Sequence, residues 1–223
     1  MAGHLLYLEG QARPLGGPGW QYMIEAVAPH SETGPPDDRT QIGGLSHDRD
    51  TQETADLAYL EFARRVAREE EILRLTGEWS RPHPWLNLLL PESSAAAIVS
   101  DTLADEDLRD LRTRGLVLLY PIPSRRLRAP LLRRPPGQLS YLFSLLRTAP
   151  ADSPEVAERM VAANRSVYER ACAQGAVAYP INALPMSRED WRAHYGSAWR
   201  SMEEAKRLYD PHAILAQGHG LWP

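Results

Sequence analysis

The sequence predicts an α+β fold in which helices cover one face of a mostly antiparallel sheet. Short apolar runs typical of strands alternate with longer segments whose apolar residues recur at helical spacing. The expected order of elements is roughly β-β-α-β-α-β-β-α-β-α. The 223 residues contain no internal repeat and no linker that would divide them, and they suit one large domain or two small ones. A content of 43% hydrophobic and 24% charged residues is typical of a soluble globular protein.

The N-terminal part predicts two short strands and a loop. The strands are residues 5–8 and 22–27, and a turn rich in glycine and proline separates them. The first strand begins almost at Met1, with no preceding segment to cover a sheet edge. This is typical of a chain that begins partway through a fold. Residues 29–50 are polar and predict a loop.

A long helix is expected next, from about Thr51 to Leu75. Asp50 is suited to cap its first turn, and Gly77 is suited to end it. Its apolar stripe consists of Leu57, Phe62, Val66 and Leu73, and the charged run at 68–71 is expected to face water.

The segment from Trp85 to Leu90 predicts a central strand, and a helix from about Ser93 to Leu111 is expected to follow it. Side chains alternate between the two faces of a strand, so one face has three leucines and the other has an aromatic, an amide and a leucine. These two sets are Leu86, Leu88 and Leu90, and Trp85, Asn87 and Leu89. Because both faces are mostly apolar, the strand is predicted to be covered on both sides.

The C-terminal half predicts two further strands, two helices and a final helical turn. The serines at 153 and 187, the first followed by proline, are typical of helix starts. The expected elements are a strand at 116–120 ended by Pro121 and Pro123, a loop at 124–137, a strand at 139–146, a helix at 153–172, an extended segment at 177–181, a helix at 187–208 and a helical turn at 210–218.

Composition disfavours several classes of protein. The net charge of −4 disfavours a nucleic-acid partner. The chain has no run that approaches the ~18 apolar residues of a membrane span, and its first ten residues do not resemble a signal peptide. Cys172 is the only cysteine, which excludes an internal disulfide and suits a reducing compartment, so we expect a cytoplasmic protein. The seven histidines are scattered without the spacing of metal ligands, and no metal site is expected.

Trp85 and Asn87 are the first candidates for ligand binding. Two residues apart on a strand, they project side by side and offer an aromatic slab and an amide to one ligand. A purine would suit this pair, because its ring can stack while an edge nitrogen forms a hydrogen bond. The alternative is a core tryptophan beside an asparagine that satisfies a neighbouring turn. Spacing alone favours this alternative, since large aromatic side chains usually lie in cores.

Six groups of residues, in order from about residue 50 to 222, resemble motifs of the FAD-dependent cytokinin dehydrogenases. Together they are far more specific than any one of them. The groups are Asp56-Leu57 with Tyr59, Phe62 and Arg65-Val66; Pro82-His83-Pro84-Trp85-Leu86-Asn87-Leu88 with Pro91; Tyr120-Pro121; Tyr141-Leu142 with Leu146-Arg147; Trp191, His194, Gly196 and Trp199; and Asp210-Pro211, Ile214-Leu215-Ala216 and Gly218.

The resemblance implies that residues 1–223 form the cytokinin-binding, or substrate (cap), domain of a vanillyl-alcohol-oxidase-type flavoprotein. It implies that Trp85 and Asn87 contact the substrate, and that Leu146, or a neighbour in its strand, lines the apolar end of the cavity. Tyr179-Pro180-Ile181 resembles a segment of the family near the flavin ring, so Tyr179 is expected to contact the cofactor and Ile181 the substrate.

His219 is a departure from the family pattern. The family typically has a glutamine close to the flavin at this position, directly after the glycine of the closing motif. An imidazole can donate the same hydrogen bond, but it titrates near neutrality, whereas an amide does not. The two interpretations that stay open are a contact with the cofactor and a tolerated surface residue.

The implied activity is oxidative cleavage of the N6 isoprenoid side chain of cytokinins by hydride transfer to FAD. The family holds FAD mainly in an N-terminal domain with a glycine-histidine-serine motif, which Gly44-Leu45-Ser46-His47 matches only in a different order. We therefore expect a chain that is split or truncated from a flavin-binding domain, without catalytic residues of its own. The alternatives are a non-catalytic remnant or small-molecule binding module, and the substrate domain of another FAD-linked amine or alcohol oxidase.

Overall fold

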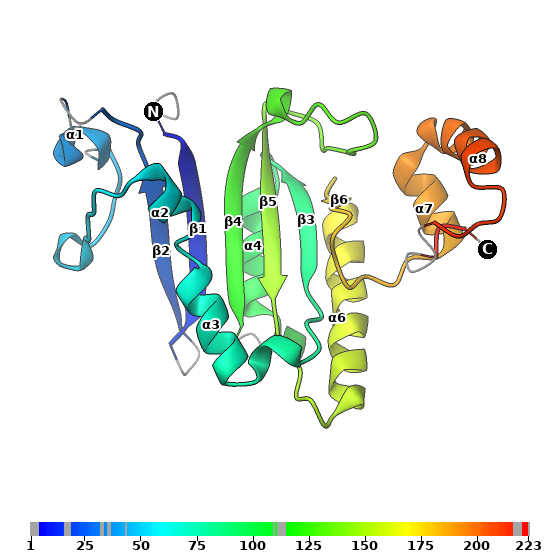
Figure 1. Cartoon of the computed structure of the whole chain (residues 1–223), viewed down its shortest axis with the longest axis horizontal. Helices are drawn as coiled ribbons and strands as arrows, with labels where there is room; N and C mark the ends of the chain where they lie inside the picture. Colours follow the sequence, from blue (N-terminus) through cyan, green and yellow to red (C-terminus); the bar gives the residue numbers. More distant parts are fainter. Residues whose placement is uncertain are drawn as a thin grey trace. The chain divides into compact units, whose positions relative to one another are not determined.

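The computed structural model describes residues 5–15, 19–31, 34, 37–42, 44–108, 110, 115–215 and 220–222. Its strands are β1 (Tyr7–Pro14), β2 (Trp20–Val27), β3 (Leu86–Pro91), β4 (Leu116–Pro123), β5 (Leu139–Leu146) and β6 (Val177–Ala178) (Figure 1). Its α-helices are α1 (Asp38–Ile42), α2 (Tyr59–Ala63), α3 (Ala67–Leu75), α4 (Ala95–Ala104), α6 (Pro154–Cys172), α7 (Arg188–Tyr195) and α8 (Ala198–Tyr209). Short 3-10 helices occupy Arg49–Thr51, Glu78–Ser80, Glu106–Leu108 and Ser124–Arg126.

The chain divides into two compact units. Unit 1 consists of residues Met1–Glu9 and Ile24–Arg81, and unit 2 consists of Gly10–Met23 and Pro82–Pro223. The division falls within β1 and β2, so each of these strands contributes residues to both units.

The strands form one sheet in the order β2-β1-β4-β5-β3-β6. β5 lies between β4 and β3 and pairs antiparallel with both, from Leu86 opposite Leu145 on one side and from Leu116 opposite Leu146 on the other. Helices accompany this antiparallel sheet, which confirms the predicted α+β class.

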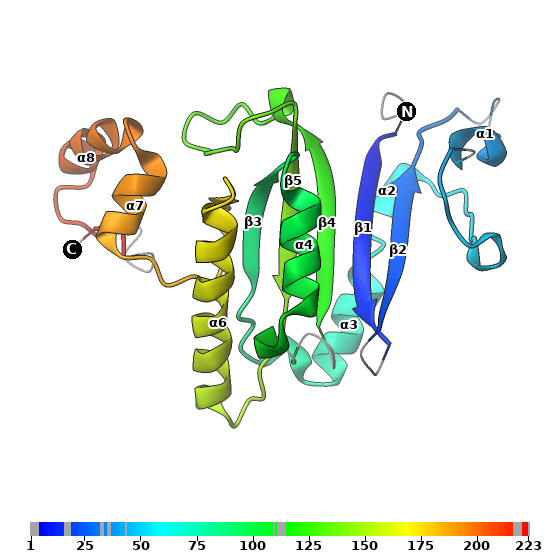
Figure 2. The ribbon, with the colours of Figure 1, turned by 180° about the vertical axis from the view of Figure 1, so that it is seen from behind.

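The core of unit 2 lies between one face of the sheet and the helices α4 and α6, and we call this the helix face. Figure 2 shows both helices on that side of the strands. Every residue of β3 is buried, which confirms the prediction of a central strand covered on both sides. The core residues from the strands include Leu86, Leu88, Leu90, Val117, Phe143 and Leu145. Those from the helices include Ile98 and Leu103 of α4 and Val167, Tyr168 and Ala171 of α6.

Several predicted elements agree with the structure. The strand at 139–146 is confirmed with the same ends, and α6 begins after Ser153 and ends at Cys172 as expected. The extended segment at 177–181 is a strand only over Val177–Ala178. The helix expected at 93–111 is shorter, because α4 ends at Ala104 and the backbone at Asp105 is extended.

The long helix expected from Thr51 to Leu75 is wrong. Residues 52–58 are irregular, and α2 and α3 follow as two short helices. The expected N-cap, Asp50, is itself capped, since its N–H donates to the carboxylate of Asp48 over 3.0 Å. A long helix in a protein is stabilised mainly by burying one face, and neither α2 nor α3 has a buried residue. The loop expected at 29–50 likewise contains α1 and a 3-10 helix.

The prediction that Pro121 ends the fourth strand is also wrong, because β4 continues to Pro123. β4 pairs with β5 along its whole length, whereas its pairing with β1 runs only from Val117 to Leu119. Proline is tolerated in a strand where no N–H is needed for a ladder. The two prolines lie beyond the part of β4 that pairs with β1.

The C-terminal helix expected at 187–208 is divided at Gly196, whose φ of 52° lies in the left-handed region that favours glycine. Ser187 caps the first part, α7, as predicted, because its Oγ accepts the N–H of Asp190 over 3.1 Å. Where a helical turn was expected at 210–218, the described residues 210–215 form a capped turn instead. The carboxylate of Asp210 accepts the N–H groups of Ile214 and Leu215 at 2.9 and 3.0 Å. Residues 216–219 lie outside the described residues.

Candidate functional site

The face of the sheet opposite α4 and α6 holds three of the predicted substrate contacts, and Figure 1 looks onto it. We call it the second face, and its residues include Asn87, Leu89, Leu118, Leu142, Ser144 and Leu146 by strand alternation. Asn87 pairs with Ser144 across β3 and β5. Continuing this register by one residue places Trp85 beside Leu146. The strand pairing therefore brings Trp85, Asn87 and Leu146 together.

The exposure of Trp85 contradicts the core position that the alternative interpretation of its motif gave this residue. Its side chain is 39% exposed, whereas the leucines that follow at 86 and 88 are fully buried. Trp85 is therefore not a core tryptophan. Its ring lies 5.5 Å from the ring of His83, centroid to centroid, and His83 Nδ1 is 3.3 Å from the hydroxyl of Thr148. His83 is a neighbour of the site that the sequence did not single out, although it lies two residues before Trp85.

The segment from Tyr179 to Ala183, which we call the arch, is bonded to β3 next to these residues. The N–H of Tyr179 donates to the carbonyl of Asn87 over 3.0 Å. The N–H of Ala183 donates to the carbonyl of Trp85 over 2.7 Å. The amide nitrogen of Asn87 donates to the carbonyl of Ile181. The arch thus brings Tyr179 and Ile181, the two other predicted contacts within the described residues, to the end of the second face.

These contacts fix the orientation of the Asn87 amide. A carbonyl oxygen accepts only from a donor, so the group that faces the Ile181 carbonyl is the NH2. Asn87 is 8% exposed, and its Oδ1 is the end of the amide turned away from this bond. An amide oxygen held in this orientation is an acceptor for an N–H.

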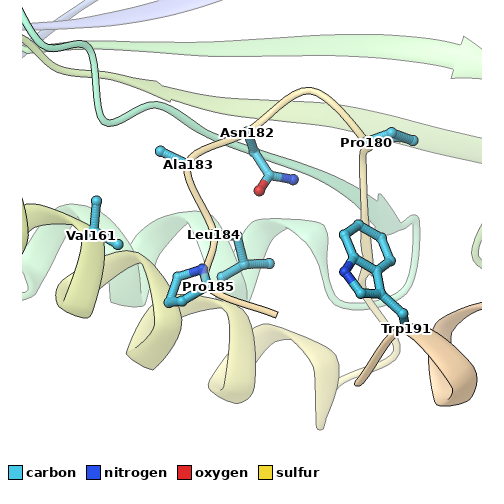
Figure 3. Close-up of a pocket in the computed structure, with 7 residues that line it drawn as sticks. All are labelled: Val161, Pro180, Asn182, Ala183, Leu184, Pro185 and Trp191. Carbon is cyan, nitrogen blue, oxygen red and sulfur yellow. The ribbon is translucent and has the colours of Figure 1, made fainter. Parts of the chain in front are cut away.

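A shallow pocket of about 280 Å³ lies between the arch, α6 and α7 (Figure 3). It is lined by Val161, Pro180, Asn182, Ala183, Leu184, Pro185 and Trp191. In Figure 3 the arch runs over the pocket, with Trp191 of α7 at one end and Val161 of α6 at the other. Trp85 and Asn87 are not among its lining residues, so the pocket and the second face are two neighbouring places that share the arch.

Two buried polar residues behind the arch were not predicted as part of the site. Arg147 follows Leu146 at the end of β5 and is 2% exposed, and Asn164 of α6 is fully buried. Burial lowers the pKa of the Arg147 guanidinium, and the nearby carboxylate of Asp110 opposes this shift. The sequence signal for Arg147 is a charged residue directly after an apolar strand.

The aromatic cluster of α7 and α8 is structural. Trp191, Tyr195 and Trp199 are buried together and pack against residues at the end of the chain. His194 lies among them, and burial lowers its pKa to about 4, with a smaller effect of the charge of Arg133. The motif tryptophans therefore build a core, and Trp191 also lines the pocket beside the arch.

The described residues include no group of three or more side chains that could hold a metal ion. His219 lies outside the described residues, so its predicted contact with the cofactor has no structural counterpart here.

Of the described helices, none is long and apolar enough to cross a membrane.

Comparison with known proteins gives a consistent family assignment. A family model described as "Cytokinin dehydrogenase 1, FAD and cytokinin binding" matches residues 21–222. An uncharacterized oxidoreductase of the fasciation locus of Rhodococcoides fascians is 40% identical over 184 residues, which are 82% of this chain and 41% of the relative.

Plant relatives are similar over a comparable share of the chain. Cytokinin dehydrogenase 10 of Oryza sativa subsp. japonica is 36% identical over 176 residues, which are 75% of this chain and 31% of the relative. Cytokinin dehydrogenase 2 of Arabidopsis thaliana is 33% identical over 173 residues, which are 75% of this chain and 33% of the relative. The matched part of the chain thus spans between 31% and 41% of the length of these three relatives.

Proposed function

This chain belongs to the cytokinin dehydrogenase family, and we propose that it forms the substrate-binding part of an FAD-dependent cytokinin dehydrogenase. The observation that carries the proposal is the meeting of Trp85, Asn87 and Leu146 at one end of the second face. An aromatic ring, an amide acceptor and an aliphatic side chain lie side by side there. These are the groups that an N6-isoprenoid adenine would need.

The proposed role of these residues is to orient the substrate. The purine stacks on the half-exposed ring of Trp85 and donates an N–H to Oδ1 of Asn87, while the isoprenoid chain lies against Leu146. Tyr179 and Ile181 of the arch close the same end of the face. Holding a substrate in one orientation is a large part of catalysis, since it removes the entropy cost of aligning the reacting groups.

The proposed cofactor is FAD, which when bound supplies the hydride acceptor for oxidation of the carbon next to the secondary amine. The leucines of the second face suit a flat aromatic ring system, and Tyr179 is the residue we propose beside it. His219 is proposed as a further contact on the strength of its place in the sequence alone. We propose that a separate flavin-binding domain holds most of the cofactor, and that the protein acts in the cytoplasm.

The proposal is tested by titrating isopentenyladenine into the full 223-residue chain and measuring heat of binding. Trp85→Ala should weaken the affinity by about 10-fold or more, because it removes the stacking surface. The matched control is Trp79→Ala, since Trp79 is 43% exposed in unit 1 and should leave the affinity unchanged. Equal affinity of the wild type and Trp85→Ala would contradict the assignment of the site.

Turnover separates the remaining alternatives. The chain is mixed with a flavin-binding domain of a relative, and dye reduction is followed with isopentenyladenine, with simple amines and with alcohols. Reduction by isopentenyladenine supports the proposed reaction. Reduction by an alcohol or another amine alone indicates a different FAD-linked oxidase, and binding without reduction indicates a non-catalytic binding module.

A further inference from the structure

A chain of polar side chains runs behind the arch, from the partly exposed Asp110 through the buried Arg147 to the buried Asn164. Arg147 is 2% exposed and Asn164 is fully buried, although burying such groups is costly unless they form hydrogen bonds. Asn164 satisfies this condition through both ends of its amide, and Arg147 does so through its two terminal nitrogens, while its buried Nε has no hydrogen-bond partner among the described residues. Buried polar networks of this kind specify one arrangement of the groups that they join.

Arg147 fixes the orientation of Asn164. Its Nη2 donates to Oδ1 of Asn164 and, over 2.6 Å, to the carbonyl of Met160. Its Nη1 lies 3.2 Å from each carboxylate oxygen of Asp110, so the guanidinium is held from two sides. Because a guanidinium only donates, the end of the Asn164 amide that faces it is the oxygen.

The NH2 end of Asn164 is therefore directed at the backbone of the candidate site. Nδ2 donates to the carbonyl of Pro84 over 3.2 Å and to the carbonyl of Ala183 over 2.9 Å. Pro84 directly precedes Trp85, and the N–H of Ala183 is bonded to the carbonyl of Trp85. One amide thus joins the irregular segment before Trp85 to the end of the arch.

We propose that Asn164 is a positioning residue, which Arg147 orients and which holds the arch against β3 so that Trp85 and Ile181 keep their places. Thr102, a buried polar residue of α4, differs in this respect, because its hydroxyl donates to the carbonyl of Ile98 in its own helix. The structural part of this inference is independent of the ligand. Its consequence for affinity rests on the proposed function.

The test is Asn164→Asp in the full chain, because a carboxylate still accepts from Arg147 but has no N–H to donate to the two carbonyls. Amide hydrogen exchange is measured by NMR at Tyr179 and Ala183 of the arch and at Phe143 of the core. Exchange at the two arch amides should rise about 10-fold more than at Phe143, as expected for loss of two buried hydrogen bonds. The matched control is Gln174→Glu, which makes the same chemical change at an exposed position just after α6. It should leave the exchange rates of all three amides unchanged.

An equal rise at all three amides, or no rise, would overturn the proposal, since either result means that Asn164 does not act on the arch in particular. If Asn164→Asp does not fold, Asn164→Ser is used, because its hydroxyl is uncharged and keeps one donor. The arch amides should then exchange faster than Phe143 by a smaller factor, and an unchanged ratio overturns the proposal.

Affinity for isopentenyladenine is measured on the same variants. Asn164→Asp should weaken binding by about 10-fold, and Gln174→Glu should not change it. If the wild type does not bind, the proposed function fails while the exchange data still decide the positioning role. If exchange at the arch amides rises but the affinity does not change, Asn164 holds the arch without affecting ligand binding. The predicted consequence for affinity is then overturned.

Discussion

Unit 1 and unit 2 contain similar apolar residues but differ in what covers them. In unit 1, none of the helices α1, α2 and α3 has a buried residue, and Leu60 and Leu75 are 58% and 80% exposed. In unit 2, Leu88 and Leu145 are fully buried between the sheet and its helices. An apolar stripe in a sequence therefore predicts which face of a helix would be buried, whereas burial itself depends on a second element that packs on it.

The contacts that hold unit 1 together are of a different kind. The guanidinium of Arg65 lies over the rings of Tyr7 and Phe62, 4.7 and 4.3 Å from their centroids, and forms an ion pair with Glu25 at 3.2 Å. Cation–π contacts and exposed ion pairs each contribute about 1 kcal/mol or less. Burial of a leucine contributes more, so unit 2 is expected to be the more stable of the two.

The largest expected difference between the units is in the free energy of unfolding lost when one leucine in each is truncated. Leu88→Ala should lower the free energy of unfolding by about 2–5 kcal/mol, because it leaves a cavity in a packed core. Leu60→Ala removes the same atoms from an exposed side chain and should cost less than about 0.5 kcal/mol. Urea unfolding followed by circular dichroism measures both, and similar costs would show that Leu60 is covered in solution.

The next largest effect is expected from acid, which should lower the stability of unit 2 but not that of unit 1. The reason is that one histidine in each unit has a shifted pKa, and the two shifts have opposite directions. Burial lowers the pKa of His194 in unit 2 to about 4, so the unfolded chain takes up this proton first as the pH falls below 6.5. The stability of unit 2 should decrease from pH 6.5 to about pH 4, by on the order of 3 kcal/mol, because one pKa unit corresponds to about 1.4 kcal/mol. His30 in unit 1 is exposed, and its pKa is raised chiefly by the carbonyl of Ser31, so it adds no such loss.

The measurement is urea unfolding at several pH values, with His194→Gln as the variant that lacks the titrating group. Its stability should depend less on pH between 6.5 and 4. Asp190 does not interfere in this range, since its pKa is lowered to about 2, first of all by the hydrogen bond from Arg165. The same pH dependence in the variant and the wild type would refute the role of His194.

The smallest difference in stability is expected from breaking one ion pair in each unit. In unit 2, Asp190 accepts hydrogen bonds from Arg165 at 2.8 and 3.0 Å and also caps α7, so Asp190→Ala should cost about 1–2 kcal/mol. In unit 1, Glu70 and Arg74 form an exposed pair on α3, and Glu70→Ala should cost less than about 0.5 kcal/mol. Thermal unfolding compares the two, and a larger loss for Glu70 would reverse the proposed order of stability.

The parts of the fold that local sequence controls were predicted well. Alternation placed Trp85 and Asn87 on one face of β3 and three leucines on the other, and the serines at 153 and 187 marked the starts of α6 and α7. The failures depend on distant residues. The helix expected at 51–75 lacks a buried face, and β4 passes through two prolines beyond its pairing with β1.

The same holds for the candidate site. The strand motif indicated Trp85 and Asn87, but the hydrogen bonds that orient them come from Ile181 and Ala183, almost a hundred residues later in the chain. Asn164 and Arg147 join the site through contacts between α6, β5 and β3. The local sequence marks Arg147 only as a charged residue directly after an apolar strand, and it does not mark Asn164, so the role of the pair follows from the folded structure.

The alternation of β3 also constrains how this protein can diverge. Substitutions at 85 and 87 alter the second face, and those at 86 and 88 alter the core, so ligand preference and folding can be changed by separate sets of mutations. Insertion or deletion of one residue within the strand would exchange the two sets and place an amide in the core. Variants selected for a different ligand should therefore keep the length of β3 and differ at its odd-numbered positions.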